Sequence, residues 1–170
     1  MKVYLEEQKF TQKLVIIGLS LAFVVIIFSI VKDWKTISNG SNSDIFEAFI
    51  GLIIIILVSL LFANLKLKTR IDEKGIQYQY YPLQLSYKLT PWNEVSKCYI
   101  RNYDAIFEYG GWGMKFSFRK KTGKSFTVKG SDGLQLELTN GTKILIGTQK
   151  KEEIQRTLDT YQHKVISSEY

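Results

Sequence analysis

The chain has 170 residues, enough for one modest domain and a further segment, and its formal net charge is +7. It contains one cysteine, Cys98, and one histidine, His163, which excludes an internal disulfide, a cysteine-based zinc site and a histidine-rich metal site. A single histidine also disfavours histidine-based catalysis. We expect Cys98 to be a small buried side chain in a strand, and His163 to be solvated in the last turns of a helix.

Two apolar runs near the N-terminus predict membrane-spanning helices. The first, Leu14–Val31, has 18 residues and no charge. As a helix it would be roughly 27 Å long, close to the thickness of a bilayer core. The second covers about residues 48–64. A cleaved signal peptide would have a shorter apolar core, and a helix pair in a soluble protein would not be apolar on every face.

The segment between the two runs, Lys32–Glu47, is polar and rich in turn residues, so the two helices should form a hairpin. Cytoplasmic flanks of membrane helices carry an excess of Lys and Arg. The link holds two lysines, whereas the outer flanks hold seven basic residues: Lys2, Lys9, Lys13, Lys66, Lys68, Arg70 and Lys74. We expect an inner (plasma) membrane protein with both termini in the cytoplasm. Neither run contains a charge, which argues against an ion path of its own.

From Leu65 onward the hydrophobic pattern changes from helical to alternating, which predicts strands. We expect about seven short antiparallel strands, drawn from alternating runs at residues 65–71, 76–80, 83–89, 95–101, 114–120, 124–129, 134–138 and 142–147. Asn140-Gly141 is a strong signal for a two-residue hairpin turn. Thr148 is expected to cap a closing amphipathic helix. Its apolar face would consist of Ile154, Leu158, Tyr161 and Val165.

These patterns predict an α+β membrane protein with two parts. Residues 1–65 would form the transmembrane hairpin and residues 66–170 the cytoplasmic domain. Residues 66–170 hold 18 basic and 11 acidic side chains, so the whole net charge belongs to the predicted cytoplasmic part.

The order of strands followed by one helix resembles the pleckstrin-homology-like (PH-like) fold, an antiparallel β-barrel or sandwich closed by a C-terminal helix. The chain also resembles bacterial membrane proteins that join a two-helix hairpin to such a domain. Four stretches carry this resemblance: IDEKGIQYQYYPL, LTPWNEVSKCYI, YGGWGMKFSF and GLQLELTNGTKILIGT. It covers about residues 10–165 and implies a fold and a location. Phosphoinositide-binding members hold phosphates with several basic residues at the first hairpin, where this chain has Asp72-Glu73-Lys74-Gly75, which disfavours an inositol-phosphate site.

A basic run follows a glycine-rich stretch. Between residues 115 and 129 there are six basic side chains and no acidic one: Lys115, Arg119, Lys120, Lys121, Lys124 and Lys129. Two interpretations stay open, a solvated hairpin tip or a patch facing anionic headgroups, where each Lys or Arg contributes about 1 kcal/mol. Aromatic residues alternate with these charges, as in nucleic-acid-binding surfaces. Strand alternation would turn them inward, however, so we expect no nucleic acid partner.

The glycine-rich stretch itself is Gly110-Gly111-Trp112-Gly113. We expect a bend or bulge there, with Trp112 packed over the backbone, and we keep Trp112 with the six basic residues as the candidate lipid- or partner-binding site. Thr122–Ser125 resembles the end of a phosphate-binding loop. That motif needs a glycine where Phe118 stands, and a helix after the loop, so we reject it.

The sequence shows no combination of acid, base and nucleophile typical of an enzyme. Glu94, Asp104 and Glu108 are the carboxylates of the middle loops, and nothing pairs them. We therefore predict a protein without enzymatic activity, metal or cofactor. It would be a membrane-anchored adaptor that binds a protein partner or the anionic lipid surface. The alternative is an accessory subunit of a membrane transport or envelope-assembly complex that acts through its hairpin, for which Gly18 and Ala22 provide a small-residue pair.

Overall fold

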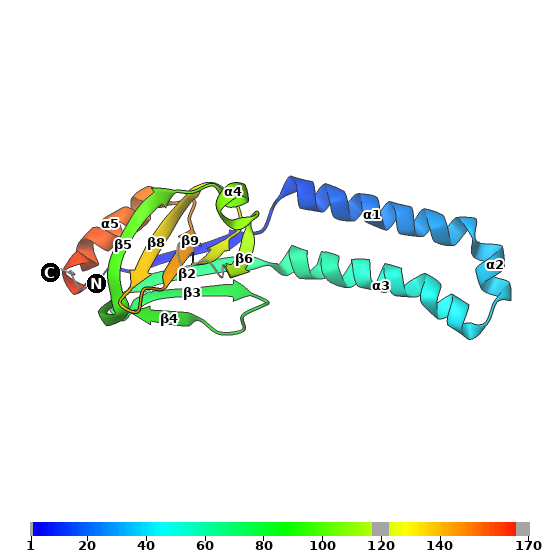
Figure 1. Ribbon diagram of the computed structural model, residues 1–170, viewed down its shortest axis with the longest axis horizontal. Helices are drawn as coiled ribbons and strands as arrows, with labels where there is room; N and C mark the ends of the chain where they lie inside the picture. Colours follow the sequence, from blue (N-terminus) through cyan, green and yellow to red (C-terminus); the bar gives the residue numbers. More distant parts are fainter. Residues whose placement is uncertain (1, 117–122, 166–170) are drawn as a thin grey trace. The chain divides into compact units, whose positions relative to one another are not determined.

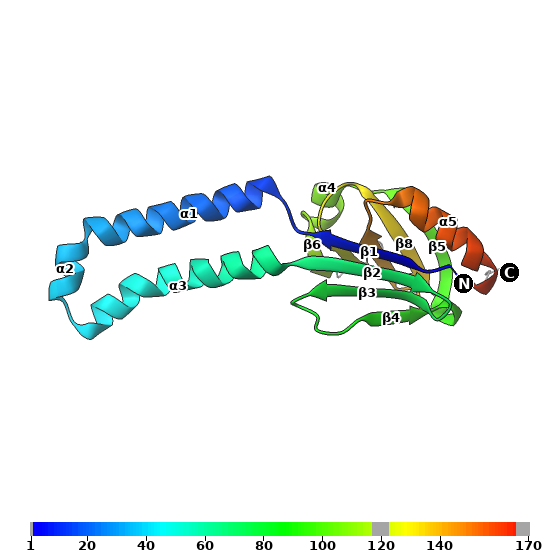
Figure 2. The ribbon, with the colours of Figure 1, turned by 180° about the vertical axis from the view of Figure 1, so that it is seen from behind.

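The structure is a computed structural model that describes residues 2–116 and 123–165. It divides into two compact units, shown from opposite sides in Figures 1 and 2. Thr11–Asn64 form the helical unit. Met1–Phe10 and Leu65–Tyr170 form the β unit.

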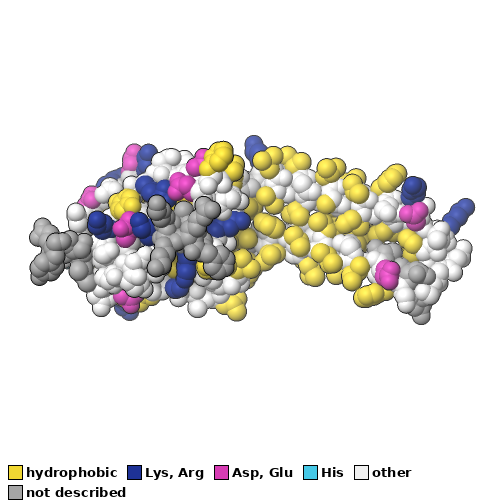
Figure 3. Space-filling view, viewed as in Figure 1, with side chains coloured by type: hydrophobic (Ala, Val, Ile, Leu, Met, Phe, Trp, Pro, Cys, Tyr) yellow, Lys and Arg dark blue, Asp and Glu magenta, His cyan; other side chains and the backbone are white. Residues whose placement is uncertain are grey.

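The helical unit contains α1 (Lys13–Lys32), the short α2 (Trp34–Asn39) and α3 (Asn42–Asn64). α1 confirms the first predicted helix, and none of its residues is buried. α3 begins six residues earlier than predicted, and α2 replaces part of the predicted turn. α1 and the Ile45–Asn64 part of α3 are each long and apolar enough to cross a membrane. Figure 3 shows hydrophobic side chains over the helical unit.

The β unit contains two sheets. The first has the order β1-β2-β3-β4, all antiparallel: β1 (Tyr4–Lys9), β2 (Lys66–Asp72), β3 (Gly75–Tyr81) and β4 (Lys88–Pro91). The second has the order β5-β8-β9-β7-β6: β5 (Val95–Asn102), β6 (Gly113–Phe116), β7 (Lys124–Thr127), β8 (Asp132–Leu138) and β9 (Lys143–Gly147). This confirms the α+β class and the sheet-rich second part. The described strands do not close into a barrel, they exceed seven, and β7 runs parallel to β9.

One strand was missed because its inward positions are polar. β1 lies within the first ten residues, which we had assigned to the transmembrane hairpin. Its buried face carries Tyr4, Glu6 and Gln8, so the sequence lacks the apolar alternation that predicts a strand. β1 pairs with β2 along its whole length. The β unit is therefore formed by residues that precede the helical unit in the sequence together with residues that follow it.

The core lies between the two sheets. Tyr78 of β3 meets Phe126 of β7 with ring centroids 4.6 Å apart, and the Tyr80 hydroxyl donates to the backbone carbonyl of Thr127 at 3.1 Å. The other fully buried members are mainly aliphatic side chains from both sheets: Leu67, Ile71, Ile76, Leu134, Leu136, Leu145 and Ile146. Burial of these side chains is the main favourable contribution to folding.

The predicted closing helix is present as α5 (Lys151–Tyr161), with Ile154, Leu158 and Tyr161 buried. The Tyr161 ring stacks on Trp92, which lies in a short 3₁₀ helix, η1 (Trp92–Glu94), at a centroid distance of 5.4 Å. Thr148 does not occupy the N-cap position, which belongs to Lys150. Its hydroxyl oxygen instead accepts the N–H of Lys150 at 3.0 Å.

Two further predictions concern β4 and the chain end. The alternating run at residues 83–89 was expected to be one strand, but β4 begins at Lys88, and the segment before it forms turns and bends. His163 is exposed, as predicted, in the 3₁₀ helix η2 (Gln162–Lys164) that follows α5.

Candidate functional site

The described members of the predicted basic run do not share one face of the sheet. Lys115 of β6 lies opposite Ser125 of β7 in the ladder, and Lys124 is the neighbour of Ser125 along β7. Because neighbouring strand residues point to opposite faces, Lys115 and Lys124 lie on different faces of the sheet. Lys129 follows β7 in an exposed bend. The other three members lie outside the described residues: Arg119, Lys120 and Lys121. Contact of this run with lipid stays a prediction.

The glycine-rich stretch forms the predicted bend at residues 110–112, directly after a short helix, α4 (Ala105–Tyr109). Gly110 has φ +71° and Gly111 has φ +116°, a left-handed backbone that favours glycine. Their N–H groups donate to the carbonyls of Ile106 and Ala105 at 2.8 and 2.7 Å. These two bonds satisfy carbonyls in the last turn of α4.

Trp112 is packed against the β unit, in agreement with the sequence interpretation. Its ring is partly buried against a cluster formed by Tyr103, Ala105 and Leu145. Its Nε1–H donates to the backbone carbonyl of Gly130 at 2.9 Å. The side chain therefore has a structural role in the β unit, and its binding of lipid or a partner stays a prediction.

The start of α4 is capped by carboxylates. Oδ1 of Asp104 accepts the N–H groups of Ile106 and Phe107, both at 2.9 Å. The carboxylate of Glu108 accepts the N–H of Asp104, also at 2.9 Å. These three bonds satisfy donors that the first turn of a helix leaves without intrahelical partners. Asp104 and Glu108 are thus brought together by α4, while Glu94 lies apart, in η1.

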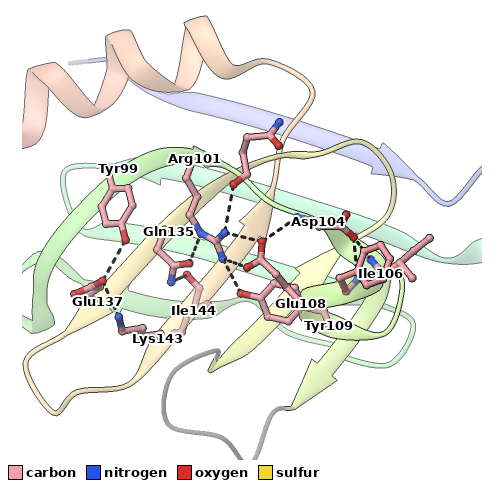
Figure 4. Close-up of polar contacts among 12 residues, drawn as sticks. Tyr99, Arg101, Asp104, Ile106, Glu108, Tyr109, Gln135, Glu137, Lys143 and Ile144 are labelled. Atoms are coloured by element: carbon pink, nitrogen blue, oxygen red, sulfur yellow. Dashed lines mark hydrogen bonds and ion pairs between the residues drawn. The ribbon is translucent and has the colours of Figure 1, made fainter.

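Arg101 of β5 connects α4 to the five-stranded sheet (Figure 4). Its guanidinium forms a two-pronged bond to Glu108, with Nη1–Oε1 at 3.1 Å and Nη2–Oε2 at 2.8 Å. Nε donates to Oε1 of Gln135 at 3.0 Å, Nη2 to the hydroxyl of Tyr109 at 3.1 Å, and Nη1 to the carbonyl of Asn102 at 3.3 Å. These five bonds use all five N–H donors of the side chain, so Arg101 serves to hold α4 in place.

The pKa shifts of Arg101 and Glu108 agree with a stable ion pair between the two side chains. The hydrogen bond from Arg101 lowers the pKa of Glu108 below its ordinary value. Burial opposes the charge of Arg101, but the bonds to Glu108 outweigh it and raise the pKa of Arg101. Both side chains therefore stay charged at neutral pH.

α4 holds two apolar side chains in solvent. Phe107 is 91% exposed and Ile106 is 59% exposed. In Figure 3 a group of hydrophobic side chains stands out where Figure 1 places α4. These exposed apolar side chains on a well-anchored element make α4 a candidate contact site.

A second exposed apolar group lies between β3 and β4. Leu85 is 84% exposed and Leu83 is 51% exposed. The segment is nevertheless fixed to β3, because the side-chain amide of Gln79 donates to the carbonyls of Gln84 and Leu85 at 3.1 and 2.8 Å. The N–H of Tyr80 donates to Oε1 of Gln84 at 3.0 Å. We define Tyr81–Leu89 as the apolar loop.

A third surface is a groove beside β5. It has a volume of about 480 Å³ and is lined by one apolar residue of β5 and four polar residues of α5: Ile100, Lys151, Glu152, Gln155 and Arg156. β5 stands at one edge of the five-stranded sheet, where its ladder partner is β8. An edge strand beside a groove is suited to receive an extended segment of another chain.

The outer face of the five-stranded sheet carries a further surface group. Glu137 accepts from the Tyr99 hydroxyl at 3.2 Å and pairs with Lys143 at 3.1 Å (Figure 4). The hydrogen bond from Lys143 lowers the pKa of Glu137. These side chains are partly exposed, and such surface ion pairs contribute little to stability.

A buried carboxylate that sequence reasoning missed lies at the contact of β1 with the start of α5. Glu6 is 7% exposed and accepts from the hydroxyl of Thr148 and the N–H of Gln149, both at 2.8 Å. It also accepts from the hydroxyl of Tyr4 at 2.5 Å. Burial, followed by the bond to Glu6, raises the pKa of Tyr4. The arrangement joins the N-terminal strand to the C-terminal helix.

The described residues contain no group of three or more His, Cys, Asp or Glu side chains placed to hold a metal ion. Cys98 is partly buried rather than fully buried. Burial raises the pKa of its thiol to about 11, which keeps it protonated and unreactive at neutral pH.

The chain matches no protein-family profile, no curated protein and no solved structure at a significant level.

Proposed function

We propose that this chain is a bacterial inner-membrane protein with two spans, whose β unit is a PH-like, non-enzymatic adaptor at the cytoplasmic surface. The adaptor binds a protein partner that supplies an extended segment. α1 and α3 support the membrane anchor. α1 has 20 residues, carries no charge between Lys13 and Lys32 and buries no side chain, and a helix of this composition needs an apolar solvent.

The observation that carries this proposal is the insertion of the helical unit between two paired strands. Lys9 at the end of β1 is the ladder partner of Lys66 at the start of β2. The N–H of Phe10 donates to the carbonyl of Leu65 at 3.0 Å. α1 therefore starts, and α3 ends, from neighbouring points of one sheet. Two crossings that leave and return at one sheet must begin and end on the same side of the membrane.

This geometry favours a hairpin over other topologies. If α1 and α3 each cross the membrane once, both ends of the chain lie with the β unit on the same side of the membrane. The excess of Lys and Arg in the flanks favours the cytoplasm as that side. The partner site of the proposal is the free edge of β5 with its groove, because main-chain bonds to an edge strand supply affinity and the groove residues supply selectivity.

The test uses the full chain in native membranes. A photo-activated cross-linking residue is placed at Gln155 in the groove, and at Lys97 on the outer face of β5 as a matched control. We expect a protein adduct from position 155 that is absent from position 97 and is lost with Ile100→Asp, which places a charge in the groove. Adducts from position 54 of α3 alone would instead support an accessory subunit that acts through its hairpin.

A further inference from the structure

The two most exposed large apolar side chains in the described part of the chain both belong to the β unit. They are Phe107 at 91% and Leu85 at 84%, and they exceed every such residue of the apolar helices. Both stand on segments fixed by several hydrogen bonds, α4 by Asp104 and Arg101, and the apolar loop by Gln79. Apolar side chains that a fixed backbone holds in water are positioned to contact a lipid phase or another apolar surface.

Both segments lie at the same end of the β unit. In the four-stranded sheet, Lys66 has Lys9 as its ladder partner on one side and Tyr81 on the other. The apolar loop starts at Tyr81, so it leaves the sheet where the chain passes into α1 and out of α3. Figures 1 and 2 both show α4 at this end of the β unit, near the finish of β1. We call it the junction end.

The connections to the helices are short. Leu65 is the single residue between α3 and β2, and residues 10–12 separate β1 from α1. At about 3.5 Å per residue, the longer connection reaches roughly 10 Å. In the proposed two-span topology, connections of this length keep the junction end within reach of the lipid surface.

The composition of the junction end matches a lipid interface. The apolar loop carries tyrosines at positions 81 and 87, and rings of this kind sit at the headgroup level with their hydroxyls in water. Lys88 is part of the loop, and Lys66 and Lys68 lie on the neighbouring β2, where both pair with Glu7. A lysine near an anionic surface adds attraction to headgroups. The Lys68 ammonium lies 6.0 Å from the Tyr81 ring centroid.

We infer that the apolar loop and the tip of α4 are two interfacial anchors, which insert Leu85 and Phe107 into the headgroup region of the membrane entered by the hairpin. This inference rests on the proposed two-span topology. It gives the β unit two attachment points on the bilayer, and Gln155, an exposed residue of α5 outside both of them, serves as the reference position.

The test measures depth in the bilayer site by site. The full chain, with Cys98→Ala, is reconstituted into vesicles of phosphatidylcholine and phosphatidylglycerol. Single cysteines are introduced by Leu85→Cys, Phe107→Cys, Gln155→Cys and Val24→Cys, and each is labelled with an environment-sensitive fluorophore. Quenching by lipids brominated near the headgroup is then compared with quenching by lipids brominated near the chain end.

We expect labels at 85 and 107 to be blue-shifted and quenched most by the headgroup-proximal bromines. The label at 155 should be neither shifted nor quenched. The label at 24 should be quenched most by the deep bromines, which checks the proposed spans independently. A quenched label at 24 with unquenched labels at 85 and 107 would overturn the inference and leave the two-span anchor intact. A blue shift at 85 and 107 without quenching would indicate a protein contact, and would also overturn it.

Circular dichroism of each labelled variant checks that the fold is kept. If Phe107→Cys disturbs α4, Ile106→Cys on the same helix supplies the second reading of that anchor, since Ile106 is also exposed.

Discussion

Glu6 shows how a single buried side chain can join distant parts of the chain. It sits in β1, yet two of its donors, Thr148 and Gln149, come from the segment between β9 and α5. An amide at this position keeps the shape but loses the acceptor strength of a carboxylate. We predict that Glu6→Gln destabilises the β unit by about 1–3 kcal/mol, because a buried donor is left poorly satisfied.

The neighbouring residue gives the control for this prediction. Glu7 is exposed and pairs with Lys66 and Lys68 at 3.0 and 3.8 Å. Exposed pairs of this kind contribute about 0–1 kcal/mol, so Glu7→Gln should change stability little. Urea unfolding of the full chain in detergent, followed by tryptophan emission, measures both variants. Equal midpoints for the two would contradict the role assigned to Glu6.

Glu108 leads to a prediction on pH. Its pKa in the folded protein lies below the ordinary 4.5, because Arg101 stabilises the charged carboxylate. A carboxyl group whose pKa is depressed on folding contributes stability above its unfolded pKa, and loses that contribution as the pH falls through the folded pKa. The attachment of α4 should therefore be constant from neutral pH down to about 4.5 and weaken below it.

Fluorine NMR of fluorotryptophan-labelled protein in detergent tests this expectation, since Trp112 packs beside α4. We expect the Trp112 signal of the natural sequence to shift only in acid. In Glu108→Gln the signal should already be shifted at neutral pH and should follow the acid titration much less. Glu94→Gln, an exposed carboxyl of η1, should keep the natural profile. A Glu108→Gln profile identical to the natural one would exclude the proposed role of the Arg101–Glu108 ion pair in holding α4.

At the scale of elements, β1 decides which piece of the chain can fold alone. Residues 66–170 lack β1, so they would expose the edge of β2 and leave Thr148 and Gln149 without Glu6. We predict that this fragment aggregates or stays unfolded. Replacing residues 11–64 with an Asn-Gly turn should instead give a soluble, folded β unit, because Phe10 and Leu65 are already hydrogen-bonded neighbours.

Circular dichroism and a proton NMR spectrum of the two proteins make the comparison. The turn-linked version should show strand content and dispersed amide signals, and the 66–170 fragment should not. If the fragment folds as well as the turn-linked protein, β1 is dispensable and the missed strand is a minor addition to the fold.

The same elements show what a sequence can and cannot predict. α1 was predictable because a long uncharged apolar run has few alternative structures. β1 was not, because its buried residue Glu6 binds polar partners more than 140 residues away. The apolar loop carries an alternating pattern that should mark a core-facing strand, but the β3–β4 ladder stops at the pair Tyr78–Lys88. Its apolar face is therefore left in solvent.

The candidate site shows a similar division. A local signal for α4 was present, since Asp104 can cap a helix start and Gly110 can end one. The hydrogen bonds from Arg101 to α4 could not be predicted from the sequence, because they depend on how β5, β8 and α4 meet in space. The predicted basic run was visible as a count of charges, yet its described members fall on different faces of a sheet whose register the sequence did not reveal.

At the scale of the whole molecule, the decisive question is whether the apolar helices meet lipid. Val24 lies near the middle of α1 and is 60% exposed. An arginine at the centre of a membrane helix costs about 2.5–3.5 kcal/mol of insertion free energy, whereas an arginine on an exposed helix in water costs almost nothing. We therefore predict that Val24→Arg lowers the carbonate-resistant membrane fraction of the full chain. Val3→Arg should not, because Val3 is an exposed residue just before β1.

If α1 were instead an arm in aqueous solution, Val24→Arg would remove an apolar side chain from water and increase the soluble yield. The two readings thus predict opposite changes in the same fractionation, and a Val24→Arg protein that is more soluble and remains folded would refute the two-span anchor together with the adaptor function that depends on it.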